Sequence, residues 1–144
     1  MLIGINPLLS PDLLHALRSM GHRQEVAIVD ANFPCDPGSS RVIRLDGASS
    51  TETLAAVLSV LPLEQDDPVS AWRMIADGDP ANMLPIFSEF EGIVARTARR
   101  RISQIDPGEF KDRTRTAYAV VITGERRLYG GIILRKGVVA PDTA

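Results

Sequence analysis

Residues 20–34 read MGHRQEVAIVDANFP, and this stretch decides both the fold class and the place to look for a functional site. It contains a short apolar run, Val26 to Val29, which is bounded by polar residues and is typical of a buried strand. His22 stands just before the strand and Asp30 just after it. Most strands of this kind lie between featureless turns, so an imidazole at one end and a carboxylate at the other need an explanation.

A helix is expected directly before this strand. Ser10 is a good N-cap residue, and Pro11 suits the first helical position. Gly21 suits the position just beyond the end of the helix. His15 lies off the apolar face and is expected to be exposed. The residues expected on that face are Leu13, Leu14, Leu17 and Met20.

The rest of the chain continues to alternate between helices and strands. Helices are expected within residues 49–61, 85–100 and 106–117, and strands within residues 41–47, 69–76, 117–123 and 130–139. The first of these helices should bury Leu54, Val57, Leu58 and Leu61. The alternation predicts a single compact α/β domain over residues 1–144, with a mixed β-sheet flanked by helices.

Composition excludes several classes of protein. The 144 residues are 44% hydrophobic, which is enough for one domain with a proper core. The net charge is −2, whereas nucleic-acid binders usually carry a basic stripe, and the one basic cluster, residues 98–101, is expected to be a solvated helix end. No signal peptide and no apolar run of the ~20 residues that span a bilayer are present. The sequence therefore predicts a cytoplasmic protein that binds neither nucleic acid nor membrane.

The common catalytic and cofactor motifs are missing from the sequence. Cys35 is the single cysteine, so neither an intrachain disulfide nor a thiolate metal cage is possible, and nothing near it is arranged to make it a nucleophile. No phosphate loop, dinucleotide fingerprint, zinc-binding histidine pair or nucleophile elbow occurs. We expect no metal and no cofactor. His22, Asp30 and Tyr129 remain as candidates.

These residues have both a functional and a plain structural explanation. A histidine titrates near pH ~6.5, so His22 can give or take a proton at neutral pH. Asp30 stands at the carboxyl end of a strand, where open α/β sheets tend to place ligands. However, a histidine after a glycine at a helix end is more often a surface residue, and an aspartate in this context often caps a turn.

The quoted stretch, extended back to Ile5, and the segment AYAVVITGERRLYGGIILRKGV (residues 117–138) together resemble the D-ribose pyranase/L-fucose mutarotase family, especially its fucose mutarotase branch. The combination of M-G-H, D-A-N-F-P and T-G-E-x-x-x-Y-G carries the resemblance. It covers both ends of the chain strongly and the middle weakly.

The resemblance implies an isomerase that interconverts the anomers of a monosaccharide without a cofactor. It assigns the proton donor to His22 and substrate binding to Asp30 and to Tyr129, Gly130 and Gly131. It further implies self-association into a ring, often a decamer, with sites where subunits meet. A fully extended segment from His22 to Asp30 would span roughly 26 Å, which one sugar cannot bridge. Either residues 22–24 fold back over the strand end, or one site takes its residues from different chains.

Two positions depart from the family pattern. Pro107 stands where the family commonly has arginine or histidine, and Gly131 stands where it has asparagine. Arg113, or else Lys111 or Arg115, is the candidate to replace the missing donor. The proton donor is intact, so anomer exchange is expected to persist while the identity of the sugar is open. The alternatives are a degenerate protein that binds a carbohydrate without turnover, and a structural ring with no ligand.

Overall fold

The computed structural model describes residues 1–34 and 41–143, and Cys35 lies outside the described residues. Its helices and strands follow the order expected from the sequence, with one additional short strand. The helices are α1 (Pro11–Ser19), α2 (Ser50–Leu58), α3 (Pro85–Ala98) and α4 (Pro107–Thr116). The strands are β1 (Glu25–Val29), β2 (Arg41–Leu45), β3 (Ala71–Met74), β4 (Ser103–Ile105), β5 (Ala119–Thr123) and β6 (Ile132–Arg135), and a short 3₁₀ turn, η1 (Pro141–Thr143), follows.

The six strands form one mixed sheet in the order β2-β5-β1-β6-β3-β4. β1 lies near its centre, parallel to β5 and antiparallel to β6. The register pairs Glu25 with Arg135 at one end of β1 and Ile28 with Ile132 at the other. As a result, the residues just before β6 lie beside those just after β1.

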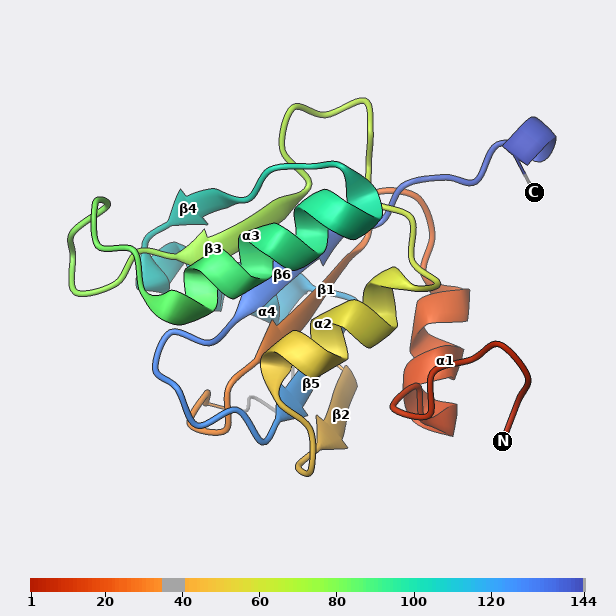
Figure 1. Ribbon diagram of the computed structural model, residues 1–144, viewed down its shortest axis with the longest axis horizontal. Coiled ribbons are helices and arrows are strands. Elements are labelled where there is room, and N and C mark those ends of the chain that lie inside the picture. The colour runs from red at the N-terminus through yellow and green to blue at the C-terminus, as the bar shows by residue number, and fades with distance from the viewer. Residues whose placement is uncertain (35–40, 144) are drawn as a thin grey trace.

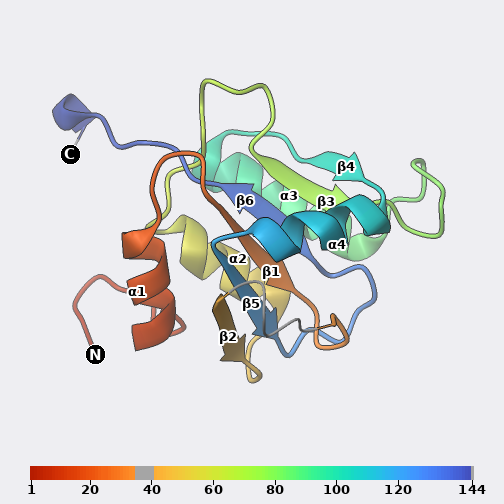
Figure 2. The same cartoon turned by 180° about the vertical axis from the view of Figure 1, so that it is seen from behind.

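Helices cover both faces of this sheet. α2 and α3 lie side by side over one face, with α1 at its edge, and α4 lies on the opposite face (Figures 1 and 2). The first face carries the larger apolar cluster, which contains Leu13, Leu54 and Phe87. The second carries Val29, Trp72 and Phe110. The α/β class, the mixed sheet and the flanking helices predicted from the sequence are confirmed.

The helix boundaries follow from the capping residues. Ser10 caps α1, and its hydroxyl accepts a hydrogen bond from the Leu13 amide. Ser49 and Glu52 form a reciprocal capping box at the start of α2. All four predicted core residues of α2 and its following turn are buried, and so are Leu13, Leu17 and Met20 of the first helix, whereas Leu14 is half-buried and His15 exposed.

Three sequence-based expectations need correction. The short strand β4 was not predicted, because its three residues Ser-Gln-Ile have no apolar run and it pairs only with β3 at the edge of the sheet. The last strand ends at Arg135, earlier than expected, because beyond it only Lys136 pairs, in an isolated bridge with Leu63, and Gly137 lies close against the Leu63 main chain. In the basic cluster, Arg99 and Arg101 are exposed as expected, but Arg100 is half-buried and donates hydrogen bonds to Ser70 and to the carbonyl of Asp67.

Within the described residues, no helix combines the length and the apolar character that crossing a membrane requires.

Candidate active site

His22 lies in the tight turn between α1 and β1, and its orientation is fixed by a buried carboxylate. Arg23 adopts a left-handed conformation (φ +69°), and its amide donates to the carbonyl of Lys136, 2.8 Å away. Nε2 of His22 is hydrogen-bonded to Oε2 of Glu64. Among the described residues, Nδ1 of His22 has no hydrogen-bond partner. The imidazole is therefore held at one nitrogen and open at the other.

Glu64 is itself held firmly. Its side chain is 2% exposed, and its Oε1 accepts hydrogen bonds from the amides of Gln65 and Asp66 at 2.9 and 3.0 Å. The hydrogen bond from the Asp66 amide lowers the pKa of Glu64 against the opposing effect of burial, and the bond from His22 lowers it further. Glu64 is thus a carboxylate at neutral pH, with Oε2 directed at His22.

The His22 side chain is 42% exposed and lines a cavity of about 500 Å³. Most of the other lining groups are apolar. They include Leu17, Met20 and Pro62, together with Val60, Val138 and Val139, which are exposed. A proton donor or acceptor at the edge of an apolar cavity has access to a ligand without being buried itself.

Asp30 follows the carboxyl end of β1 and is 6% exposed. Its Oδ1 accepts a hydrogen bond from the Asn32 amide at 2.9 Å, so it caps the turn that the sequence context suggested. Burial raises the pKa of this carboxyl, and the nearby charge of Glu125 adds to the rise, although the Asn32 amide opposes it. Asp30 is therefore a turn-capping residue with a perturbed carboxyl, a combination that often marks functional sites.

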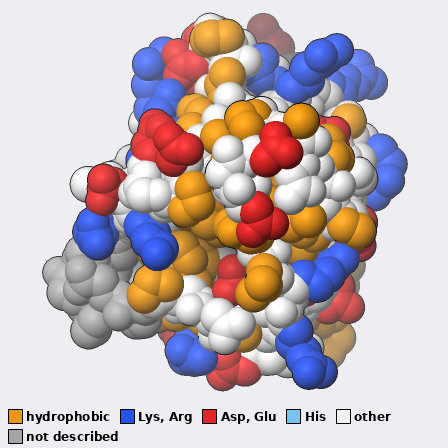
Figure 3. Space-filling view, turned by 90° about the vertical axis from the view of Figure 1, so that its left-hand side faces the viewer, with side chains coloured by type: hydrophobic (Ala, Val, Ile, Leu, Met, Phe, Trp, Pro, Cys, Tyr) orange, Lys and Arg blue, Asp and Glu red, His pale blue; other side chains and the backbone are white. Residues whose placement is uncertain are grey.

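Tyr129 lies at the same end of the sheet. Its hydroxyl donates to Oδ1 of Asp77 and accepts from the Asp77 amide, each at 3.1 Å. Both residues have positive φ, +59° for Tyr129 and +52° for Asp77, which is uncommon away from glycine. Tyr129 lines a cavity of about 310 Å³ with Leu84, Pro85, Ile86 and Leu128. Figure 3 views the molecule from the left-hand side of Figure 1, and there hydrophobic side chains lie in the middle with acidic side chains among them and Lys and Arg mostly around the rim.

Gly130 and Gly131 stand where side chains would collide. A Cβ on Gly130 would lie 2.8 Å from Cγ of Glu125 and 2.9 Å from the carbonyl oxygen of Arg127. On Gly131 it would lie 3.0 Å from Cζ of Phe110. The two glycines therefore let the chain run closely over its neighbours on its way into β6.

Arg113 lies at the other end of β1. Its guanidinium donates to Glu25 at 2.7 Å, and its Cζ lies 3.7 Å above the centre of the Trp72 ring. Arg135 contacts the same Glu25 and also Asp67, and Asp67 in turn pairs with Arg23. The charge of Arg113 is thus already paired within the chain.

The predicted residues therefore fall into two groups. Asp30, Tyr129, Gly130 and Gly131 lie together at the carboxyl end of β1, whereas His22 and Arg113 lie at its amino end. Residues 22–24 do not fold back over the carboxyl end, because the Arg23 and Lys136 main chains are hydrogen-bonded beside Glu64. The described residues contain no group of three or more potential metal ligands.

Comparison with known proteins identifies the family. Residues 3–139 match the RbsD / FucU transport protein family. This chain belongs to that family. Human fucose mutarotase is 41% identical over 145 residues, covering 95% of this chain and 94% of the relative. L-fucose mutarotase of Actinobacillus pleuropneumoniae is 35% identical over 142 residues, covering 96% of this chain and 97% of the relative.

A solved structure of the RbsD/FucU family supports the same assignment. The crystal structure of the fucose mutarotase from Streptococcus pneumoniae in complex with L-fucose matches with a TM-score of 0.87 and 35% identity, covering 96% of this chain and all of that chain (100%). The family resemblance inferred from the sequence is confirmed, and it extends through the middle of the chain as well as its ends.

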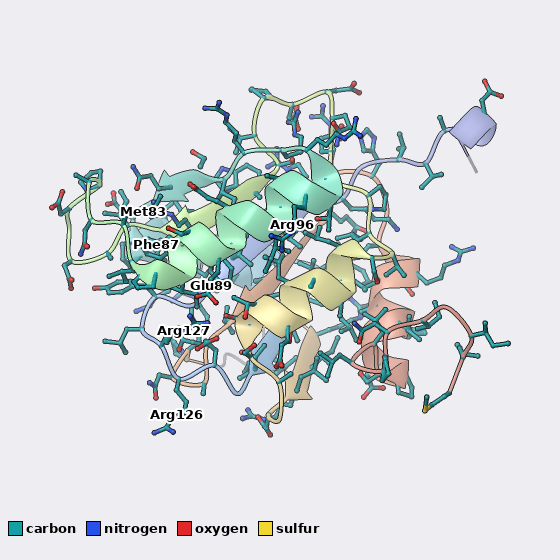
Figure 4. The ribbon with its side chains drawn as sticks, in the orientation of Figure 1. Met83, Phe87, Glu89, Arg96, Arg126 and Arg127 are labelled. Carbon is teal, nitrogen blue, oxygen red and sulfur yellow. The ribbon has the colours of Figure 1, made fainter. Side chains whose placement is uncertain are left out.

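Two structurally important residues of this RbsD/FucU member were not found from the sequence. Glu64 contacts His22 across 42 positions of sequence, and no local pattern links them. Glu125 belongs to the T-G-E motif, and its buried carboxylate contacts Ser50 and Arg127. Arg127 also pairs with Glu89 of α3, toward which it points in Figure 4, while Arg126 points away. The T-G-E motif, which is part of the family resemblance, was the available signal for Glu125.

Proposed function

We propose that this protein is a monosaccharide mutarotase that interconverts the α and β anomers of L-fucose or a related sugar. The observation that carries the proposal is the His22 imidazole, held by a buried carboxylate at Nε2 and open at Nδ1, in a chain similar over nearly its whole length to fucose mutarotases. The reaction is an isomerisation. It needs proton transfer but no redox step.

The chemistry suits a single well-placed imidazole. Opening a pyranose requires one proton delivered to the ring oxygen and one removed from the anomeric hydroxyl, and reclosure on the other carbonyl face gives the other anomer. Only the C1–O5 bond breaks and forms again. A positioned general acid or base contributes typically about 10²–10⁴-fold, which is sufficient for a reaction that already proceeds in water.

We assign sugar binding to the group at the other end of β1. Asp30 accepts hydrogen bonds from sugar hydroxyls, the ring of Tyr129 packs on an apolar sugar face, and Gly130 and Gly131 let the ligand approach the main chain. Arg113 is a further polar group on the His22 side. These roles remain predictions.

The separation of the two groups favours a site shared between two copies of the chain. One sugar in contact with both His22 and Asp30 needs the amino end of β1 from one copy and the carboxyl end from another. Val60, Val138 and Val139 are exposed beside His22, and Met83 and Leu128 are exposed near Tyr129, so each group is accompanied by apolar surface suited to a neighbour. Assembly into a ring or decamer and a cytoplasmic location remain predictions as well.

Saturation-transfer NMR on L-fucose, D-ribose and D-galactose tests the proposed activity. The wild-type protein should exchange the anomers of at least one sugar faster than buffer, and His22→Ala should lose the effect while keeping the wild-type oligomeric state, which sedimentation measures. His15→Ala, in the other histidine of the chain, is the matched control and should retain full exchange. If no sugar exchanges faster with the wild-type protein, the proposal is wrong.

A sugar-binding protein without turnover is the second candidate. The observation in its favour is the absence of a side-chain donor at Pro107 and Gly131, where relatives of the fucose type have polar side chains. Calorimetric binding of a sugar by a protein that exchanges no anomers would select this second function.

A further inference from the structure

We propose that Lys136 is a positioning residue for His22. Its side chain fixes the start of the turn of residues 20–24, which carries the imidazole, and its main chain fixes the end of that turn. The proposal rests on the proposed function, because it concerns the placement of the same proton donor. Lys136 directly follows β6 and lies 116 positions from Met20 in the sequence.

The side chain of Lys136 binds the end of α1. Its Nζ donates hydrogen bonds to the carbonyl oxygens of Leu17, 3.1 Å away, and Met20, 2.6 Å away. Met20 is the residue at which α1 ends, and the chain runs from it through Gly21 to His22. The last carbonyls of a helix have no partner within the helix and carry partial negative charge, so an ammonium is well suited to bind them. A charged group thus fixes the point where the turn begins.

The main chain of Lys136 binds the far end of the same turn. The Arg23 amide donates to the Lys136 carbonyl at 2.8 Å, and the Lys136 amide donates to the Gln24 carbonyl at 2.9 Å. Gln24 also closes the turn internally. Its amide donates to the Gly21 carbonyl at 3.2 Å, and its Oε1 accepts from the Gly21 amide at 2.6 Å. His22 therefore lies at the tip of a short turn that one distant residue holds at both ends.

The surroundings of Lys136 indicate more than a helix cap. Arg18 already supplies a cation in the last turn of α1, so the helix end alone does not require a second one. Lys136 is half-buried, and it lines the same cavity of about 500 Å³ as His22. Burial lowers the pKa of its ammonium, and the charge of Arg18 adds to this effect. Partial burial of an ammonium is unfavourable unless its hydrogens are bonded, and here the two carbonyls below the His22 turn accept them.

The reaction explains why the position of this turn matters. The imidazole has to reach both the ring oxygen and the anomeric hydroxyl of one bound sugar. A displacement of about 1 Å at a reacting group can reduce the rate by about 10²-fold. Because both main-chain hydrogen bonds remain when the ammonium is removed, we expect the turn to loosen at Met20 while the strand end keeps its place.

The decisive variant is Lys136→Met, which removes the ammonium and keeps most of the side-chain volume. We expect kcat for anomer exchange to fall about 10–100-fold and KM to change less than about threefold, because the proton donor is displaced while the sugar-binding residues are intact. Lys136→Arg keeps a cation that can donate to the same carbonyls, and it should recover most of the lost kcat. If Lys136→Met does not fold, Lys136→Gln replaces it, with the same expected direction of change.

The matched control is Ser10→Ala, which weakens α1 at its other end. The Ser10 hydroxyl accepts a hydrogen bond from the Leu13 amide at 3.3 Å, and neither residue contacts the turn. This variant destabilises the same helix and should retain wild-type kcat and KM. Circular dichroism and thermal unfolding establish that each variant is folded at the assay temperature. A wild-type kcat in the Lys136 variant, or an equal loss of kcat in Ser10→Ala, would overturn the proposal.

¹⁵N NMR observes the turn without any sugar. Lys136→Met should reduce the hydrogen-exchange protection of the Arg23 amide and shift the imidazole resonances of His22, while those of His15 stay unchanged. Unchanged protection and unchanged His22 resonances would overturn the proposal, even if kcat were reduced. If the wild-type protein exchanges no anomers, the proposed function is wrong, and this measurement still decides whether Lys136 holds the His22 turn.

Discussion

Glu125 binds the first residue of α2: its Oε2 accepts hydrogen bonds from both the amide and the hydroxyl of Ser50, at 3.3 and 3.2 Å. The two residues are 75 positions apart in sequence. A carboxylate at a helix N-terminus satisfies free amides and interacts favourably with the helix dipole. Arg127 closes the arrangement from the other side, with Nε 3.0 Å from Oε1. The loop that leads to Tyr129 is therefore anchored to α2, a helix that is distant in the sequence.

Glu125→Gln should destabilise the protein in a pH-dependent way. Burial disfavours the ionised form, but the hydrogen bonds from Arg127 outweigh it, and the pKa of Glu125 lies below its ordinary value of 4.5. A lowered pKa in the folded state means that the stabilisation is present above pH 4.5 and disappears as the pH falls through the folded pKa. We expect the free energy of unfolding to fall by about 1.5–3 kcal/mol at pH 7, typical of hydrogen bonds to a charged group, and the difference to shrink as the pH falls through the folded pKa.

Chemical denaturation at several pH values measures this effect. Glu89→Gln is the matched control, because Glu89 contacts the same Arg127 but is 47% exposed. That variant should lose at most about 1 kcal/mol, as surface ion pairs do. Equal losses for the two variants, or a Glu125→Gln loss that does not shrink as the pH falls below 4.5, would contradict the role assigned to Glu125.

Asp30→Asn should stabilise the protein and weaken sugar binding. Burial raises the pKa of Asp30 in the folded state above its ordinary value of 3.8. The effect of pH on stability is opposite to that for Glu125. Stability is highest when Asp30 is protonated and falls as the pH rises through the folded pKa. An asparagine still accepts from the Asn32 amide. We expect the free energy of unfolding to rise by about 0.5–2 kcal/mol at pH 7, the usual range for a single stabilising substitution, and to be unchanged near pH 3.

Calorimetry on the same Asp30→Asn protein checks the second half of this prediction. If Asp30 binds sugar hydroxyls, affinity should fall although the protein is more stable. Asp46→Asn, at an exposed carboxylate whose neighbour Arg44 is its partner, should change neither quantity appreciably. A variant that is more stable and binds sugar normally would leave Asp30 with its turn-capping role alone.

Replacing Gly130 and the adjacent Gly131 by alanine should destabilise the protein to different extents. At Gly130 the new Cβ meets the Arg127 carbonyl oxygen at 2.9 Å, and main chain cannot move aside easily. At Gly131 it meets the ring edge of Phe110 at 3.0 Å, which is the end of a side chain. We expect the free energy of unfolding to fall by about 3 kcal/mol for Gly130→Ala, the upper end of the range for overpacking, and by about 1 kcal/mol for Gly131→Ala. Thermal unfolding checks the order, and a larger loss for Gly131→Ala would contradict the packing described.

The sequence predicted most of the fold because local signals and burial agreed. Ser10, Pro11 and the apolar run after Glu25 each specify their element without help from distant residues. The strand β4 was missed for the opposite reason: Ser103–Ile105 has no strand pattern and is set by its parallel pairing with β3.

The candidate site was predicted only in part. The stretch 20–34 identified His22 and Asp30, but it gave no information on what lies behind the imidazole, because Glu64 reaches it through tertiary structure. The same limit applies to Arg113, whose pairing with Glu25 and stacking on Trp72 depend on the packing of α4 against the sheet. The two ends of one strand can be located from the sequence, but the residues that contact them in the folded protein cannot.

Pro107→Arg should increase the affinity for L-fucose. Pro107 is the first residue of α4 and is half-buried, and the family resemblance implies an arginine at this position. One regained hydrogen bond contributes about 0.5–1.5 kcal/mol, equivalent to a roughly 2–12-fold lower KM. Stability should fall by about 0.3–1 kcal/mol, because a cation is unfavourable at a helix N-terminus. Pro107→Ala is the control for loss of the proline ring and should not improve KM. An unchanged KM for fucose, together with a lower KM for another sugar of the panel, would show that this position selects a different substrate.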